Sequence, residues 1–140
     1  MVPEESTTPD LVKLGEHFVE AANRRDFDAM MSFFAPDAVW VGTGLRTAFR
    51  GVAAIRGFLQ DWLASYEELW SEQEEALDLG NGVAFSVLIQ KARPVGSSSE
   101  VRQRIGVVSE WVDGLIARAT FYYDIDEARA AAERLAEDRG

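Results

Sequence analysis

The sequence predicts one α+β domain, because helical periodicity dominates the first half of the chain and long β-type segments dominate the second half. The 140 residues suffice for one domain with a single core. The content of 47% apolar and 27% charged residues is ordinary for a globular protein. We therefore expect helices packed on a mostly antiparallel sheet, with residues 1–9 as a loose tail and residues 10–140 as a single domain.

Three helices are expected before the sheet. Thr8 can cap the first, which has apolar residues at helical spacing over residues 10–24. A second, shorter helix is expected over residues 26–34, and Pro36 with its neighbour Asp37 should end it. An apolar stripe predicts the third over residues 52–67.

The sheet should contain one short strand and four long ones. The short strand is expected at residues 38–43, and Gly42 and Gly44 allow a tight bend after it. The long strands are expected at residues 69–79, 83–93, 100–112 and 115–123. Gly80-Asn81-Gly82 and Asp113-Gly114 are typical of hairpin turns. A charged, alanine-rich helix over residues 124–137 closes the chain.

Several classes of function are excluded by composition. The absence of cysteine excludes thiolate zinc sites and cysteine nucleophiles, and a single histidine, His17, excludes multi-histidine metal sites. A net charge of −10 disfavours nucleic acid and anionic membranes as partners. No apolar run is long enough to cross a bilayer, and the first ten residues lack the features of a signal peptide. We expect a cytoplasmic protein without a metal or cofactor.

Several segments resemble one family in order and spacing. Residues 18–23, 25–28 and 34–40 are similar to the opening of SnoaL-like and ketosteroid-isomerase-like proteins. Residues 50–58 resemble that family's entry to its third helix, and residues 113–124 resemble its last hairpin and strand. These segments span most of residues 10–126, and the chain is identified as a SnoaL-like member of the nuclear transport factor 2-like superfamily.

The resemblance implies a half-open cone, in which three N-terminal helices close over a strongly curved sheet and leave a deep apolar pocket. That superfamily includes polyketide cyclases, ketosteroid isomerases, limonene epoxide hydrolases, dehydratases and association domains without chemistry. The fold therefore does not settle the function.

The catalytic residues of the best-known members are missing. The ketosteroid isomerase site of a tyrosine, a carboxylate base, a supporting tyrosine and a buried acid falls at Phe18, Gly42, Leu59 and near Ser109. The Asp-Arg-Asp set of epoxide hydrolases falls near Leu88, Gln90 and Phe121. Neither mechanism can run on these side chains.

Strand alternation predicts which residues face the pocket. On 100–112 the inward set is Gln103, Ile105, Val107, Ser109 and Trp111. On 115–123 it is Ala117, Ala119, Phe121 and Tyr123, which leaves Ile116, Arg118, Thr120 and Tyr122 outside. Both faces of 83–93 are apolar, so the sequence does not decide which face lines the pocket. A sheet that is apolar on both faces predicts a second buried surface, such as a homodimer interface on the outer face of the sheet.

The expected pocket is an aromatic cone with a few polar points, suited to a small apolar or aromatic ligand. Its expected lining is Phe18, Trp40, Leu59, Leu63, Gln103, Ile105, Val107, Ser109, Phe121 and Tyr123. The alternative is that these large side chains fill the cone. The catalytic candidates are Tyr123, Ser109 and His17, although no orienting partner for His17 is evident.

Three functions remain open from the sequence. One is a small-molecule pocket protein that acts on a polyketide-like or terpenoid-like ligand, with cyclase, isomerase or dehydratase chemistry if it is an enzyme. The second is a non-catalytic ligand-binding or dimerisation module. The third is an isomerase or hydrolase whose acid and base occupy positions new to the family.

Overall fold

The computed structural model describes residues 10–42 and 48–140. The expected tail and the end of the short strand, at Thr43 and Gly44, lie outside these residues. The elements in chain order are α1 (Leu11–Asn23), α2 (Phe27–Met31), β1 (Phe34–Val41), β2 (Ala48–Arg50), α3 (Val52–Ala64), β3 (Tyr66–Gly80), β4 (Val83–Pro94), β5 (Val101–Val112), β6 (Leu115–Tyr122) and α4 (Ile125–Asp138). The α+β class with N-terminal helices and a C-terminal helix is confirmed.

The six described strands form one mixed, mostly antiparallel sheet in the order β2-β1-β6-β5-β4-β3. Only β1 and β6 run parallel among them. Asn81 and Gly82 make the β3–β4 turn, and Asp113 and Gly114 make the β5–β6 turn, all four with positive φ. Both pairs fit two-residue hairpin turns, as the sequence predicted.

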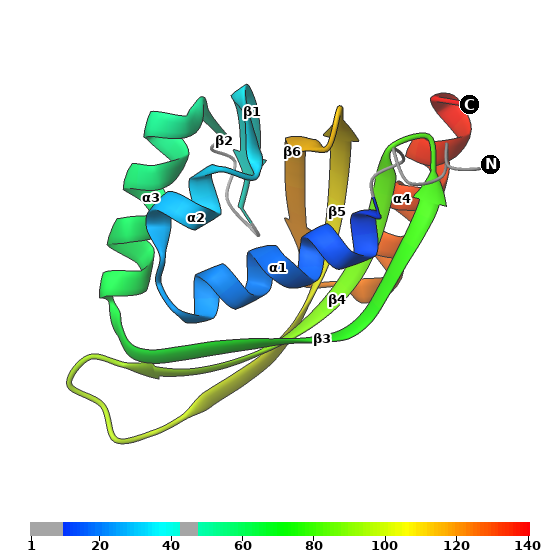
Figure 1. Cartoon of the computed structure of the whole chain (residues 1–140). Coiled ribbons are helices and arrows are strands. Elements are labelled where there is room, and N and C mark those ends of the chain that lie inside the picture. The colour runs from blue at the N-terminus through cyan, green and yellow to red at the C-terminus, as the bar shows by residue number, and fades with distance from the viewer. Residues whose placement is uncertain (1–9, 43–47) are drawn as a thin grey trace.

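The two faces of the sheet are covered by different helices (Figure 1). Helices α1, α2 and α3 pack on the inner face around a core that includes Met30, Trp40 and Leu59. Helix α4 packs on the outer face, where its alanines at a spacing of four contact β4 and β5. This outer cluster consists of Val83, Phe85, Val87, Val108, Ala128, Ala132 and Ala136.

The packing of α4 shows which face of β4 lines the inner side of the sheet. Ser86, Leu88 and Gln90 face the helices α1 and α3, whereas Phe85 and Val87 lie under α4. Both faces of the strand are apolar because the chain covers both itself. The apolar outer face of β4 is thus explained without a second subunit.

Part of the free edge of β3 is covered by side chains at the end of α1 and just after it. The Asn23 amide donates to the carbonyl of Ser71 (2.9 Å) and accepts from the Ser71 amide (2.8 Å), in the manner of a neighbouring strand. Arg25 donates to the carbonyl of Tyr66 at 2.9 Å. Such pairing satisfies backbone groups that an edge strand otherwise leaves open.

Several element boundaries differ from the predictions. The cap of α1 is Asp10, whose carboxylate accepts from the amide of Lys13, rather than Thr8. Helix α2 ends at Met31. Pro36 lies within β1 and does not end the helix, because the chain pairs with β6 as a strand from Phe34 onward.

Helix α3 also ends early, at Ala64, because residues 66 and 67 belong to β3, which pairs with β4 from Tyr66 onward. Strand β2 was not predicted. It has only three residues, too few for alternation to show.

The expectation of a strongly curved sheet is wrong. The long strands bend, but the sheet is not strongly curled and stays open, with β2 and β3 as its edges (Figure 1). Strands β4 and β5 pair in unbroken register from Val83 opposite Glu110 to Ala92 opposite Val101. Strong curvature needs bulges or kinks, and this central pair has none.

Candidate functional site

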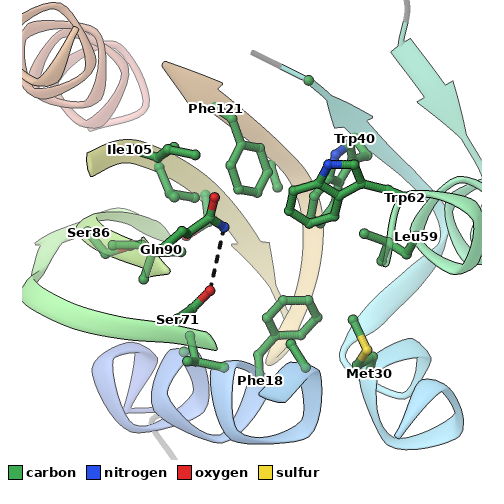
Figure 2. A pocket seen from close by; sticks show the side chains of 18 of the residues that line it. Phe18, Met30, Trp40, Leu59, Trp62, Ser71, Ser86, Gln90, Ile105 and Phe121 are labelled. Carbon is green, nitrogen blue, oxygen red and sulfur yellow. Dashed lines mark hydrogen bonds between the residues drawn. The ribbon is translucent and has the colours of Figure 1, made fainter. Parts of the chain in front are cut away.

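A cavity of about 420 Å³ lies between α1, α3 and the inner face of the sheet. Its volume falls within the usual range for small-molecule sites. Figure 2 shows side chains from the helices and from the strands converging on it from opposite sides. The alternative that large side chains fill this space completely is therefore wrong.

All ten residues predicted for the pocket line this cavity. They come from α1 (Phe18), β1 (Trp40), α3 (Leu59, Leu63), β5 (Gln103, Ile105, Val107, Ser109) and the region of β6 (Phe121, Tyr123). Tyr123 is 61% exposed, which places it at the rim. Whether these residues bind a ligand stays a prediction.

The three catalytic candidates do not come together. Ser109 and Tyr123 both line the cavity, but His17 is exposed on α1 and is absent from the lining. A general base must come within hydrogen-bond reach of its substrate. His17 therefore has no part in chemistry within this cavity.

Aromatic rings hold the wall of the cavity in place. The rings of Trp40 and Phe121 have centroids 4.4 Å apart, and Phe18 meets Phe34 edge to face at 5.6 Å. The Phe58 ring lies 6.4 Å from that of Trp62 and nearly parallel to it. Contacts of this kind add to the burial energy of each ring and fix its orientation. The cavity thus has a pre-formed wall that a flat molecule can contact.

Ser109 has a defined hydrogen-bond orientation. The Trp111 indole Nε1 donates to its Oγ at 2.8 Å. A hydroxyl that accepts this bond keeps its own O–H donor. Because Ser109 lines the cavity, that donor is available to a carbonyl or ether oxygen in it.

A polar row crosses the opposite wall. Ser71 of β3, Gln90 of β4 and Gln103 of β5 are register partners and all line the cavity. Gln73 of β3 and Ser86 of β4 also line the cavity. Of this row the sequence predicted only Gln103, because both faces of 83–93 are apolar and no inward set was predicted for 69–79. On β4, the alternation of Ser86, Leu88 and Gln90 was the signal that could have identified the inner face.

The described lining of the cavity carries no charged side chain: it contains no Asp, Glu, Lys, Arg or His. Charges pair elsewhere in the described chain. On the outer face Arg129 makes two bonds to Glu75 (2.9 and 3.0 Å), and this hydrogen bonding holds the pKa of Glu75 below its ordinary value. On β4, Arg93 lowers the pKa of Glu67 in the same way. The cavity is thus a neutral, low-polarity environment.

The positions at which the family's catalytic residues would fall all line this one cavity. They are Phe18, Gly42, Leu59, Leu88, Gln90, Ser109 and Phe121. The positions implied by the resemblance therefore gather at one cavity, and they hold apolar or neutral side chains.

One register prediction was wrong. Ile116, expected outside, is 5% exposed and lines the cavity, whereas Ala117 does not. Trp111 pairs with Ile116, but the preceding Glu110 pairs with Arg118, so Ala117 is the extra residue of a bulge. A bulge reverses the alternation on one side of it, which simple counting cannot anticipate.

Neither a membrane-spanning helix nor a metal cluster is found within the described chain. None of its helices combines the length and hydrophobicity needed to cross a bilayer. Its acidic and histidine side chains form no group of three or more that could hold a metal ion.

Comparisons with known proteins agree with this fold. A family model described as SnoaL-like domain matches residues 16–119. A protein of ketosteroid isomerase-like fold from Catenulispora acidiphila, solved with trimethylamine, has a TM-score of 0.73 and 14% identity over 89% of this chain and 94% of its own. No curated protein sequence matches the chain.

Two further similar structures also carry ligands. TerC, co-crystallised with polyporic acid, has a TM-score of 0.71 and 15% identity, covering 88% of this chain and 97% of its own. A Mycobacterium tuberculosis protein in complex with estradiol-17β-hemisuccinate has a TM-score of 0.70 and 16% identity, covering 81% and 92%. At these identities the likeness concerns the fold alone.

Proposed function

The chain belongs to the SnoaL-like domain family, and from this premise we propose that it binds a small, flat and largely apolar molecule in the cavity between α1, α3 and the sheet. One observation carries the proposal. The cavity of about 420 Å³ is walled by aromatic and aliphatic side chains and has no charged residue in its described lining. Sites of this kind bind ligands by shape and apolar contact, with a few polar groups to orient them.

The ligands of fold relatives support the small-molecule part of this proposal. Trimethylamine, polyporic acid and an estradiol ester are all small organic molecules bound by proteins of this fold. A polyketide-like or terpenoid-like ligand would match the aromatic wall formed by Trp40, Phe121 and Trp62.

A finer form of the proposal is catalysis of the cyclase, isomerase or dehydratase class on such a ligand. The groups available for it are the oriented hydroxyl of Ser109 and the phenol of Tyr123 at the rim. Replacement of Tyr123 by Phe removes the phenol hydroxyl and keeps the aromatic ring. Turnover of a candidate substrate should fall in Tyr123→Phe, and full activity in this variant would remove Tyr123 from the mechanism.

The binding proposal can be tested with naphthalene as a probe, followed by amide NMR shifts during titration. We expect saturable shifts at residues of the cavity, such as Phe18 and Ile105. Ser86 lines the cavity and is only partly buried, so Ser86→Phe should fill the space and weaken binding by at least about tenfold. Ile89→Phe is the matched control, because Ile89 lies on the same strand and points to the other face. Equal loss in both variants, or no binding to the parent protein, would refute the proposal.

A second candidate function is dimerisation through the outer face of the sheet. It rests on Trp70, which is 54% exposed on β3 opposite Lys91, on the part of that face that lies outside the α4 cluster. A large exposed aromatic side chain is a frequent component of protein interfaces. This candidate is compatible with a ligand in the cavity, because the cavity lies on the other face of the sheet.

A further inference from the structure

The polar row of Ser71, Gln90 and Gln103 is unusual for a cavity that is otherwise apolar. Ser71 and Gln90 are 7% and 8% exposed and are the buried polar residues of the described chain. Strand pairing places Gln90 directly between Ser71 and Gln103. The row therefore forms a continuous strip of hydroxyl and amide groups across three strands.

Hydrogen bonds within the protein use little of this strip. Gln90 Nε2 donates to Ser71 Oγ at 3.5 Å, the longest separation that still counts as a hydrogen bond, and this is the only bond of the Gln90 side chain among the described residues. A glutamine amide offers two donors and two acceptor lone pairs. Most of the capacity of Gln90 is therefore open to the cavity.

The row is nevertheless held firmly in position. Asn23 fixes the backbone of Ser71 through two hydrogen bonds, of 2.8 and 2.9 Å, and Gln90 lies in the unbroken β4–β5 ladder. Figure 2 shows the Gln90 amide with its nitrogen turned to Ser71 and its oxygen turned away from it. Pre-positioned polar groups of this kind orient a ligand at small entropic cost.

The charge of the ligand follows from the same lining. A carboxylate or ammonium group in the cavity would lose its hydration without meeting an opposite charge from the described lining. Burial of an unpaired charge costs far more free energy than burial of a neutral polar group that is hydrogen-bonded. Amide and hydroxyl side chains can satisfy a neutral carbonyl or hydroxyl fully.

We propose that the row of Ser71, Gln90 and Gln103 is the polar recognition site of the cavity, and that it takes an uncharged aromatic ligand by a hydroxyl or ketone group. The row binds the polar end while the rings of Phe18, Trp40 and Phe121 contact the apolar body. This inference rests on the proposed binding function and specifies its ligand class.

Three probes of equal ring size test the inference: naphthalene, 2-naphthol and 2-naphthoate at pH 7. We expect 2-naphthol to bind about fivefold more tightly than naphthalene, because one neutral hydrogen bond contributes roughly that factor. The anion 2-naphthoate should bind at least about tenfold more weakly than 2-naphthol. Binding of 2-naphthoate as tight as that of 2-naphthol would overturn the inference.

The residue test compares the ratio of the 2-naphthol and naphthalene affinities between variants. In Gln90→Leu the ratio should fall to about one, while naphthalene binds as well as before or better. Gln103→Leu provides a second variant should Gln90→Leu fail to fold. Gln60→Leu is the control, since Gln60 is exposed on α3 and should leave the ratio unchanged.

The outcomes separate this inference from the proposed function. If naphthalene binds but Gln90→Leu and Gln103→Leu leave the ratio of 2-naphthol to naphthalene affinity unchanged, only the role of the polar row is overturned. Failure of every probe to bind overturns the proposed function and the polar row together.

Discussion

The indole of Trp111 donates a hydrogen bond of 2.8 Å to the hydroxyl of Ser109, two residues earlier on β5. Both side chains lie on the cavity face, because residues two apart on a strand share a face. Trp111 is 5% exposed, so its N–H has little access to water. The serine therefore supports a buried tryptophan and at the same time presents its own O–H to the cavity.

Replacement of Ser109 by Ala should destabilise the protein by about 1–2 kcal/mol, because the buried indole N–H loses its acceptor. Urea unfolding followed by tryptophan fluorescence measures the change. Ser109→Thr is the control, since it keeps a hydroxyl at the same position and suits a strand. Equal stability of the Ala variant and the parent would show that the bond contributes nothing.

Gly106 should be intolerant of any side chain. A Cβ at this position would lie 2.6 Å from the Cβ of Ala128, so β5 and α4 would have to separate. We expect Gly106→Ala to cost about 1–3 kcal/mol by overpacking. Gly57 of α3 is the matched control, because a Cβ there meets nothing within 4 Å and alanine favours a helix. Gly57→Ala should raise stability by about 0.5–1 kcal/mol. Thermal unfolding distinguishes the two, and a stable Gly106→Ala would contradict the close approach of α4.

Much of the architecture followed from the sequence, for physical reasons. The helical stripe of α1, the hairpin turns at Asn81 and Gly114, and the alternation of β5 are local signals that tertiary structure left intact. The ten expected lining residues meet at one cavity because they lie on strongly patterned elements.

The missed features depend on contacts between distant segments. The cover of α4 over Phe85 comes from a helix whose alanine face has too little hydrophobicity to mark a buried surface. The inward position of Ile116 depends on a bulge opposite β5. Gln90 was not predicted as a lining residue, because the apolar character of both faces of β4 does not show which one points to the cavity.

Asn23 should control the stability of the β3 edge. Its amide makes both hydrogen bonds that a neighbouring strand would make to Ser71, so Asn23→Ala loses two bonds and should cost about 1–2 kcal/mol. Hydrogen exchange measured by NMR gives a local test. The amide of Ser71 should exchange faster in the variant, while that of Ile105, in the interior ladder, keeps its relative protection. Unchanged exchange at Ser71 would mean that Asn23 does not protect this edge.

Glu75 should make stability depend on acid pH. Its hydrogen bonds with Arg129 lower its pKa in the folded state from the ordinary value of 4.5. The folded state therefore favours the ionised carboxylate. This stabilisation is complete above the ordinary value and is lost as the pH falls through the lower folded value. Urea unfolding from pH 6 to pH 3 should show a smaller loss of stability in Glu75→Gln than in the parent. Glu72→Gln is the control, because Glu72 forms no ion pair within the described chain. Parallel pH profiles for the parent and Glu75→Gln would contradict the assignment.

Trp70 provides the test of the dimer proposal. We expect the parent protein to sediment as a dimer at micromolar concentration and Trp70→Glu to sediment as a monomer, because a charge on the exposed face removes the apolar contact and opposes burial. Val112→Glu is the matched control. Val112 is about equally exposed, at 50%, but lies at the far end of β5, so this variant should remain a dimer. A monomeric parent would refute the proposal, and dissociation of both variants would place the interface elsewhere. A dimer with an intact cavity would mean that the two faces of the sheet have separate roles, since Trp70 and the row of Ser71, Gln90 and Gln103 point to opposite sides.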